Sequence, residues 1–247
     1  MIVYEKTKGL TDNPLSYCPG CTHGIIQKLV AEVLAEMNLL DDAVGLASVG
    51  CSVTSYYYFN CDMVQASHGR ACAVATGIKR TLPNNIVFTY QGDGDLASIG
   101  LAETVHAANR GEHITVIFIN NGIYGMTGGQ MAPTTLLGAK TTTSPFGRNE
   151  VDHGMPIRIS EMFQTIPKVA YVERTSVSSP QQIRKAKRSI KKAFEYQIAK
   201  KGFTMIEFLS TCPVNWGMTP KEAIDYQETQ MVKYYPLGVY KDVGDDA

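Results

Sequence analysis

The stretch Gln91-Gly92-Asp93-Gly94-Asp95 decides how the rest of the chain is read. It follows the apolar run 86–90 (IVFTY), which predicts a buried strand, and it precedes a helix expected over about 96–110. Glycines between a strand end and a helix start leave backbone N–H groups and the positive end of the helix dipole available to an anion. The stretch therefore predicts a diphosphate site.

A second strand and loop complete this unit. Residues 114–119 (ITVIFI) predict another strand, which runs into Asn120-Asn121 and then 122–130 (GIYGMTGGQ). If the two strands are parallel neighbours, Asn121 lies beside Asp93. Mg²⁺ prefers such oxygen ligands together with phosphate oxygens and water. We therefore expect Asp93, Asn121 and the main-chain carbonyl of Ile123 to hold Mg²⁺. The spacing resembles the thiamine diphosphate motif; the alternative is two turn-rich strand ends in an α/β domain.

Length and composition indicate one substantial core. The chain has 247 residues, of which 44% are hydrophobic and 19% charged, and its formal net charge is zero. The sequence has no basic stripe that would indicate nucleic-acid binding. No apolar run approaches the roughly 18 residues that are needed to cross a bilayer. The first 20 residues lack the pattern of a signal peptide, so we expect a cytoplasmic protein with reduced cysteines.

Strands and helices alternate along the chain. Further strands are expected over 43–49, 169–172 and 203–209, and helices over about 22–37, 71–80, 159–165 and 180–200. This order predicts an α/β fold with a doubly wound, mostly parallel sheet. Residues 131–156 read as a long loop, either a lid or a partner-facing surface, and the tail around Tyr234-Tyr235-Pro236 is expected to be irregular. The basic run of the last helix (185–192) is either a docking patch or a solvated face.

Four cysteines are expected at one edge of the sheet. Cys18 and Cys21 form a C-x-x-C at a helix start, while Cys51 and Cys212 follow predicted strands. Four thiolates there would hold either Zn²⁺ or a [4Fe–4S] cluster, and a redox centre has a use beside thiamine diphosphate. Cys61 and Cys72 are expected to be small buried residues.

Together these motifs resemble the β subunit of the 2-oxoacid:ferredoxin oxidoreductases. The resemblance covers 17–213 and rests on CPGC (18–21), Gly50-Cys51, HGR (68–70), ATGIK (75–79), GDGD (92–95), NNGIYGMTGGQ (120–130) and TCP (211–213). One departure is Thr22, where the family commonly has glycine. The resemblance implies a thiamine diphosphate-binding fold over 18–215 that includes an iron–sulfur site, with an N-terminal arm over 1–17 and a C-terminal extension over 216–247.

The resemblance also implies the site residues. It implies Mg²⁺ ligands at Asp93, Asn121 and Ile123, and [4Fe–4S] ligands at Cys18, Cys21, Cys51 and Cys212. It implies cofactor contacts from Val49, Gly50, Cys51, Ser52, His68, Gly92, Gly94, Asp95, Gly125, Met126 and Thr127. The alternative for His68 is to cap or anchor the helix that follows it.

The implied reaction is the oxidative decarboxylation of a 2-oxoacid with coenzyme A to acyl-CoA and CO₂, with electrons passing to ferredoxin. No catalytic residue is expected in this chain, because in the family the glutamate that activates the cofactor comes from the α subunit; small γ and δ subunits are further expected partners. The stretches 56–59 (YYYF) and 68–79 favour 2-oxoglutarate or branched-chain 2-oxoacids over pyruvate. Two alternatives stay open: a non-oxidative thiamine diphosphate decarboxylase or synthase, and a zinc-stabilised nucleotide-binding module.

Overall fold

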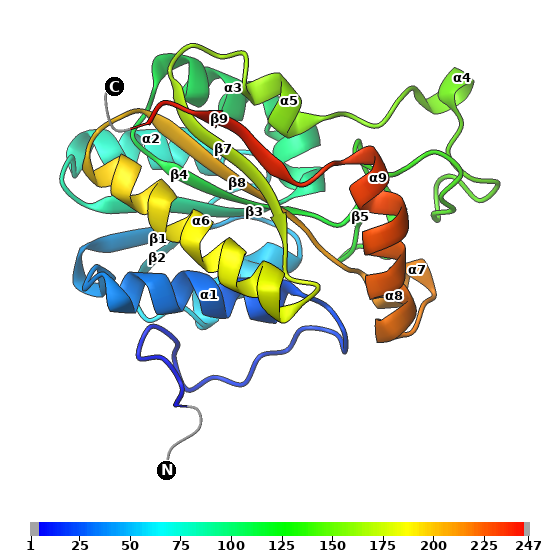
Figure 1. Cartoon of the computed structure of the whole chain (residues 1–247), viewed down its shortest axis with the longest axis horizontal. Helices are drawn as coiled ribbons and strands as arrows, with labels where there is room; N and C mark the ends of the chain where they lie inside the picture. The colour runs from blue at the N-terminus through cyan, green and yellow to red at the C-terminus, as the bar shows by residue number, and fades with distance from the viewer. Residues whose placement is uncertain (1–4, 245–247) are drawn as a thin grey trace.

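A seven-stranded sheet forms the centre of the computed structural model, which describes residues 5–244 (Figure 1). The strands lie in the order β2-β1-β3-β4-β8-β7-β9, and every neighbouring pair is parallel except β7 with β9. Their bounds are β1 (Ala43–Ala47), β2 (Asp62–Gln65), β3 (Ile86–Gly92), β4 (Thr115–Asn120), β7 (Val169–Ser176), β8 (Phe203–Leu209) and β9 (Gly238–Asp242). The predicted α/β class with a mostly parallel sheet is confirmed.

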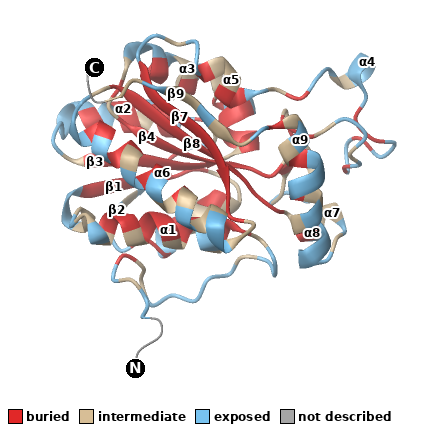
Figure 2. Cartoon of the chain, in the orientation of Figure 1, coloured by how far each residue is buried: buried red, intermediate tan, exposed pale blue. Residues whose placement is uncertain are grey.

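Helices cover both faces of the sheet. On one face lie α1 (His23–Glu36) and α6 (Pro180–Ile198), and on the other α2 (Ala71–Thr81), α3 (Leu101–Arg110) and α5 (Ile159–Phe163). The central strands are therefore buried along almost their whole length (Figure 2). This double coverage explains why they read as continuous apolar runs rather than alternating ones.

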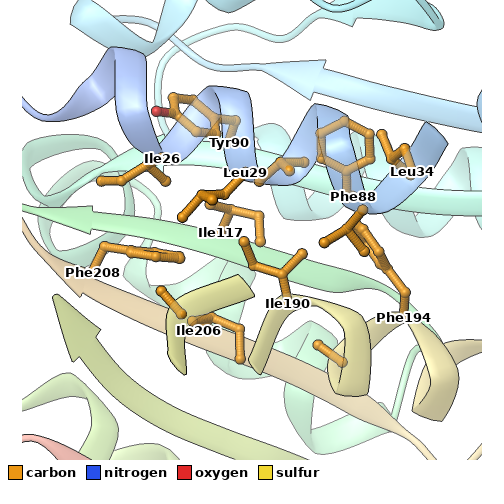
Figure 3. Close-up of a cluster of buried hydrophobic side chains, with 14 of the residues drawn as sticks. Ile26, Leu29, Leu34, Phe88, Tyr90, Ile117, Ile190, Phe194, Ile206 and Phe208 are labelled. Carbon is orange, nitrogen blue, oxygen red and sulfur yellow. The ribbon is translucent and has the colours of Figure 1, made fainter. Parts of the chain in front are cut away.

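The core beneath α1 and α6 fixes the strands that lead to the site. Figure 3 shows Ile26 of α1 and Ile190 and Phe194 of α6 packed on Phe88 of β3 and Phe208 of β8. All five side chains are inaccessible to solvent. Strands β3 and β8 are therefore held by a close-packed layer, which gives the loops that follow them a rigid base.

The C-terminal tail contains several ordered elements; the irregularity expected around Tyr234-Tyr235-Pro236 is found at Tyr235 and Pro236, whereas Tyr234 ends a helix. The tail contains α7 (Pro213–Trp216), α8 (Pro220–Tyr226), a π-helical turn (Gln227–Met231), α9 (Val232–Tyr234) and the edge strand β9. Thr219 and Glu222 form a reciprocal capping box with Pro220 at the first helical position. That signature was legible in the sequence.

Several short elements escaped the sequence patterns. Strand β2 is mostly exposed at the sheet edge and has no apolar alternation, so only its pairing with β1 defines it. The helix expected from 96 begins as a π-helical turn, Asp95–Ile99, before α3. The remaining elements are 3₁₀ turns at Leu40–Asp42 and Cys51–Tyr57, the short strands β5 (Ile123–Tyr124) and β6 (Gln130–Met131), and α4 (Glu150–His153).

The basic face of α6 is held by acids of the same chain. Lys187 Nζ lies 2.8 Å from Glu32 and 2.7 Å from Glu36, and Lys192 pairs with Asp242. These contacts favour the solvated-face interpretation over a docking patch. None of the helices within residues 5–244 is both long enough and apolar enough to cross a membrane.

Candidate functional site

Asp93 and Asn121 meet at the carboxyl edge of the sheet. Strands β3 and β4 are parallel neighbours with Gly92 opposite Ile119, so both side chains leave the sheet at the same edge. The backbone N–H of Ile123 donates to Asp93 Oδ2 at 3.2 Å and to Asn121 Oδ1 at 3.3 Å. The structure therefore brings all three residues of the expected Mg²⁺ site together.

Asp93 is a buried carboxylate surrounded by neutral donors. It is only 2% exposed, and it also accepts hydrogen bonds from the backbone N–H of Gly94 at 2.8 Å and from the Thr134 hydroxyl at 2.7 Å. Burial raises the pKa of Asp93 to about 6, although these hydrogen bonds act in the opposite direction. A buried carboxylate without a cationic side-chain partner among its described contacts fits a metal cation, with the Asn121 amide oxygen as a second hard ligand.

One cavity gathers all the residues expected to contact the cofactor or Mg²⁺. Its volume is about 100 Å³. It is lined by Val49, Gly50, Cys51, Ser52, His68, Gly92, Asp93, Gly94, Asp95, Asn121, Ile123, Gly125, Met126 and Thr127, and also by His23 and Tyr124. Pockets that enclose most of a drug-sized ligand measure ~300 Å³ or more. This chain alone therefore encloses only part of a ligand as large as thiamine diphosphate.

Two positions in the wall of this cavity require glycine, one for steric and one for conformational reasons. A Cβ on Gly94 would collide with the ring of Tyr124, whose hydroxyl donates to the Gly94 carbonyl at 3.1 Å. Gly50 has φ +112°, a conformation that side chains disfavour, and it lets the chain turn sharply from β1 into the 3₁₀ turn beginning at Cys51. Both glycines shape the wall of the cavity.

His68 is oriented by a buried hydrogen-bond network. Its Nδ1 lies 2.6 Å from Asp95 Oδ1, which also accepts the Gly69 N–H at 2.6 Å. The other Asp95 oxygen accepts from Gln91 Nε2 at 2.6 Å. Both carboxylate oxygens of Asp95 are thus engaged within the protein, and one of them orients His68.

A second cavity contains the four cysteines that the sequence groups together. Cys18, Cys21, Cys51 and Cys212 line a space of about 290 Å³. The two cavities share His23, Cys51, Asn121, Gly125 and Met126, so they lie on either side of a common wall. Cys72 is buried as expected and donates to Gln91 at 3.3 Å, whereas Cys61 is only half-buried, contrary to the expectation, and contacts Met63.

The four thiols line one cavity. Among residues 5–244, no group of three or more histidine, cysteine, aspartate or glutamate side chains has the geometry to hold a metal ion. Zinc would draw four sulfurs to ~2.3 Å from a single centre, whereas a four-iron cluster spreads its thiolates around a larger body. The donor set and the space fit a cluster better than zinc. Burial, with a smaller contribution from the neighbouring thiols, raises the pKa of Cys21 to about 12 and of Cys51 to about 11.

Four residues at the site carried no assignment from the sequence. His23 hydrogen-bonds Tyr90 at 3.0 Å, and burial lowers its pKa to about 4. Tyr124 contacts Gly94, Thr134 contacts Asp93, and Asn215 contacts Cys212. Tyr124 lies inside the 120–130 motif and could have been included, whereas Thr134 and Asn215 reach the site only through tertiary folding.

The chain is similar to known proteins over most of its length. A family model described as thiamine pyrophosphate enzyme, C-terminal TPP binding domain, matches residues 46–208. The ketoisovalerate oxidoreductase subunit VorA of Methanothermobacter thermautotrophicus is 46% identical over 240 residues, which are 97% of this chain and 50% of that protein. The 2-oxoglutarate synthase subunit KorB of Methanocaldococcus jannaschii is 38% identical over 222 residues, covering 90% of this chain and 77% of that protein.

A solved structure has the same fold over nearly the whole chain. The 2-oxoglutarate:ferredoxin oxidoreductase from Magnetococcus marinus, with 2-oxoglutarate, coenzyme A and succinyl-CoA bound, superposes with a TM-score of 0.77 at 25% identity. The match covers 98% of this chain and 86% of that one. The chain spans about half the length of its VorA relatives.

Proposed function

The chain belongs to the 2-oxoacid:ferredoxin oxidoreductase family, as a subunit with the thiamine diphosphate-binding domain, and we propose that it binds that cofactor with Mg²⁺ and a [4Fe–4S] cluster. The reaction proposed for the assembled enzyme is the CoA-dependent oxidative decarboxylation of a 2-oxoacid to acyl-CoA and CO₂, with electrons leaving to ferredoxin. The observation that carries the proposal is the pair of adjoining cavities at one sheet edge, one around Asp93 and one around the four cysteines.

The oxygen ligands around Asp93 support cofactor binding in the first cavity. Asp93, Asn121 and the carbonyl of Ile123 would hold Mg²⁺ against the diphosphate, and His68 would present its free ring nitrogen to the cofactor. When bound, thiamine diphosphate supplies an electron sink for the pair left by decarboxylation, and a cluster accepts electrons singly. The role of the protein groups would be to orient the cofactor.

The four cysteine sulfurs support cluster binding in the second cavity. Cys18 and Cys21 come from the turn before α1, Cys51 from the end of β1 and Cys212 from the end of β8. These segments meet at the edge where Asp93 also lies, because parallel strands end together. The wall shared by the two cavities supports direct electron passage from cofactor to cluster.

The substrate is proposed to be a branched-chain 2-oxoacid, with 2-oxoglutarate second. Support comes from the higher identity to the ketoisovalerate subunit, 46%, than to the 2-oxoglutarate subunit, 38%. The test is anaerobic, CoA-dependent reduction of a one-electron acceptor by the assembled enzyme. We expect a kcat/KM at least tenfold higher for 2-oxoisovalerate than for 2-oxoglutarate, and the reverse order would assign the second substrate instead.

A partner α subunit is proposed to complete the site. The cavity of this chain is lined by two carboxylates, Asp93 and Asp95, and both are engaged in hydrogen bonds within the chain, so the carboxyl group that activates the aminopyrimidine is proposed to come from the partner. The arm that leaves the body after β6 is a candidate contact surface, because Phe146 is 98% and Val151 94% exposed (Figure 1). Small γ and δ subunits and ferredoxin would carry the electrons onward.

Arg148 makes this arm rigid. Its guanidinium is buried and donates to the main-chain carbonyls of Ala132, Pro133, Thr135, His153, Gly154 and Met155. The arm is also joined to the loop that carries Asn121 and Ile123, since the Thr135 hydroxyl donates to the Gly122 carbonyl at 2.5 Å. A fixed protrusion with two exposed apolar side chains is suited to docking. Of the two alternatives for this loop, we therefore propose the partner-facing surface.

A further inference from the structure

Asn215 contacts both the cysteine cavity and the wall that separates it from the cofactor cavity. Its Nδ2 lies 3.3 Å from Cys212 Sγ and 2.9 Å from the carbonyl oxygen of Gly125. A carboxamide nitrogen carries two hydrogens, so it can donate to both acceptors at once. The side chain thus links one proposed cluster ligand to the loop beside the cofactor.

The fold holds this side chain in place. Cys212 is the N-cap of α7, and Asn215 stands three residues later, where a helical side chain reaches back toward its own N-terminus. The loop packs closely against it, since a Cβ on Gly129 would approach Asn215 Oδ1 to 3.1 Å. A Cβ on Gly125 would stand 3.4 Å from Cys51 Sγ and 3.5 Å from Cys212 Sγ. Gly129 thus allows the loop to lie against the amide, and Gly125 lies beside both sulfurs.

A hydrogen bond to a ligand sulfur changes the redox balance of a cluster. Reduction adds one electron and concentrates negative charge on the sulfurs, so a donor N–H stabilises the reduced state more than the oxidised one. We propose that Asn215 is a positioning and tuning residue that raises the reduction potential of the cluster through Cys212. The inference rests on the proposed function, because it requires the cluster.

The test is a redox titration of the full chain reconstituted with iron and sulfide, followed by EPR. Asn215→Leu removes the donor at similar volume and should lower the equilibrium constant for reduction about tenfold, a shift of about 59 mV to more negative potential for one electron. Asn215→Asp keeps the shape but replaces the donor by a negative charge, and should shift the potential further in the same direction. Gln230→Leu, the same kind of amide-to-leucine change at an exposed position outside both cavities, is the matched control and should leave the potential unchanged.

The outcomes separate this inference from the function it rests on. Potentials that decrease from the parent through the Leu variant to the Asp variant support the role of Asn215. A cluster with the same potential in the parent and both variants overturns that role and leaves the proposed function intact. A parent chain that takes up no iron overturns the proposed cluster, and this inference with it.

Discussion

Asp93 and Asn121, which lie on different strand ends, accept a hydrogen bond from the same backbone N–H, that of Ile123. The shared donor holds a carboxylate oxygen and an amide oxygen close together before any ligand is present. It also places the Ile123 residue, whose carbonyl is the third proposed ligand, at the same spot. The proposed Mg²⁺ site is therefore preorganised by the main chain, and a cation would need little rearrangement to bind.

Replacing Asp93 should abolish cofactor binding and stabilise the cofactor-free chain. Because burial raises its pKa to about 6 from 3.8, the ionised carboxylate destabilises the folded chain above pH 6, and this effect vanishes below about pH 4. Asp93→Asn should therefore raise the unfolding free energy of the cofactor-free chain at pH 8 by up to about 3 kcal/mol, less the cost of altered hydrogen bonds. It should also abolish Mg²⁺-dependent thiamine diphosphate binding, as should Asp93→Ala. Urea unfolding and calorimetric titration measure the two effects; a variant that binds as tightly as the parent would show that the ligand assignment is wrong.

Serine at any of the four cavity cysteines should lower the iron content. Cys18, Cys21, Cys51 and Cys212 are each changed singly, and iron per chain is measured after anaerobic reconstitution. Loss of one thiolate ligand is expected to cost about half of the iron or more, because serine is a poor ligand for iron–sulfur clusters. Cys72→Ser is the matched control, since its thiol lies in the core. An equal loss at Cys72 would contradict the choice of ligands.

Asp95 should act on cofactor affinity only through His68. His68→Ala and Asp95→Asn are each expected to weaken thiamine diphosphate binding about tenfold, the loss of one charge-assisted hydrogen bond. If Asp95 does no more than orient His68, the double variant should be no weaker than the single ones. Additive losses in calorimetric titrations would mean that Asp95 contacts the cofactor itself.

The exposed side chains of the arm should matter for assembly and not for folding. Phe146→Ser and Val151→Ser are expected to weaken association with the α subunit about tenfold each, while the melting temperature of the isolated chain stays the same. Leu82→Ser is the control, because Leu82 is also exposed but lies where α2 returns to the start of β3, away from the site. Unchanged association of both arm variants would remove the arm from the interface.

The parts of the fold that follow from local pattern could be predicted from the sequence. The runs 86–90 and 114–119 are apolar because their strands are covered on both faces, and parallel pairing then brings Asp93 and Asn121 together without further information. The cysteines were predicted by the same rule, since Cys51 and Cys212 both follow strands of one sheet. The sequence pattern was sufficient wherever a single strand determines where the residue that follows it lies.

Features that depend on contacts between distant segments were not predictable in this way. Asn215 reaches the cysteine cavity because α7 folds back against the loop 125–129, and nothing in its local sequence marks that contact. Strand β9 is half-exposed and gains its structure from pairing with β7. The polar composition of the tail concealed helices whose apolar faces cover only a small cluster around Met231 and Tyr235.

The central claim is that cofactor and cluster lie side by side so that electrons pass directly between them. The most direct test is the visible spectrum of the anaerobic assembled enzyme with Mg²⁺ and thiamine diphosphate, recorded before and after addition of 2-oxoisovalerate and coenzyme A. We predict broad absorbance that bleaches on substrate addition, and no bleaching for this chain without its partner or for the Asp93→Ala complex. Absorbance that dithionite bleaches but that neither 2-oxoisovalerate nor 2-oxoglutarate changes would contradict the account.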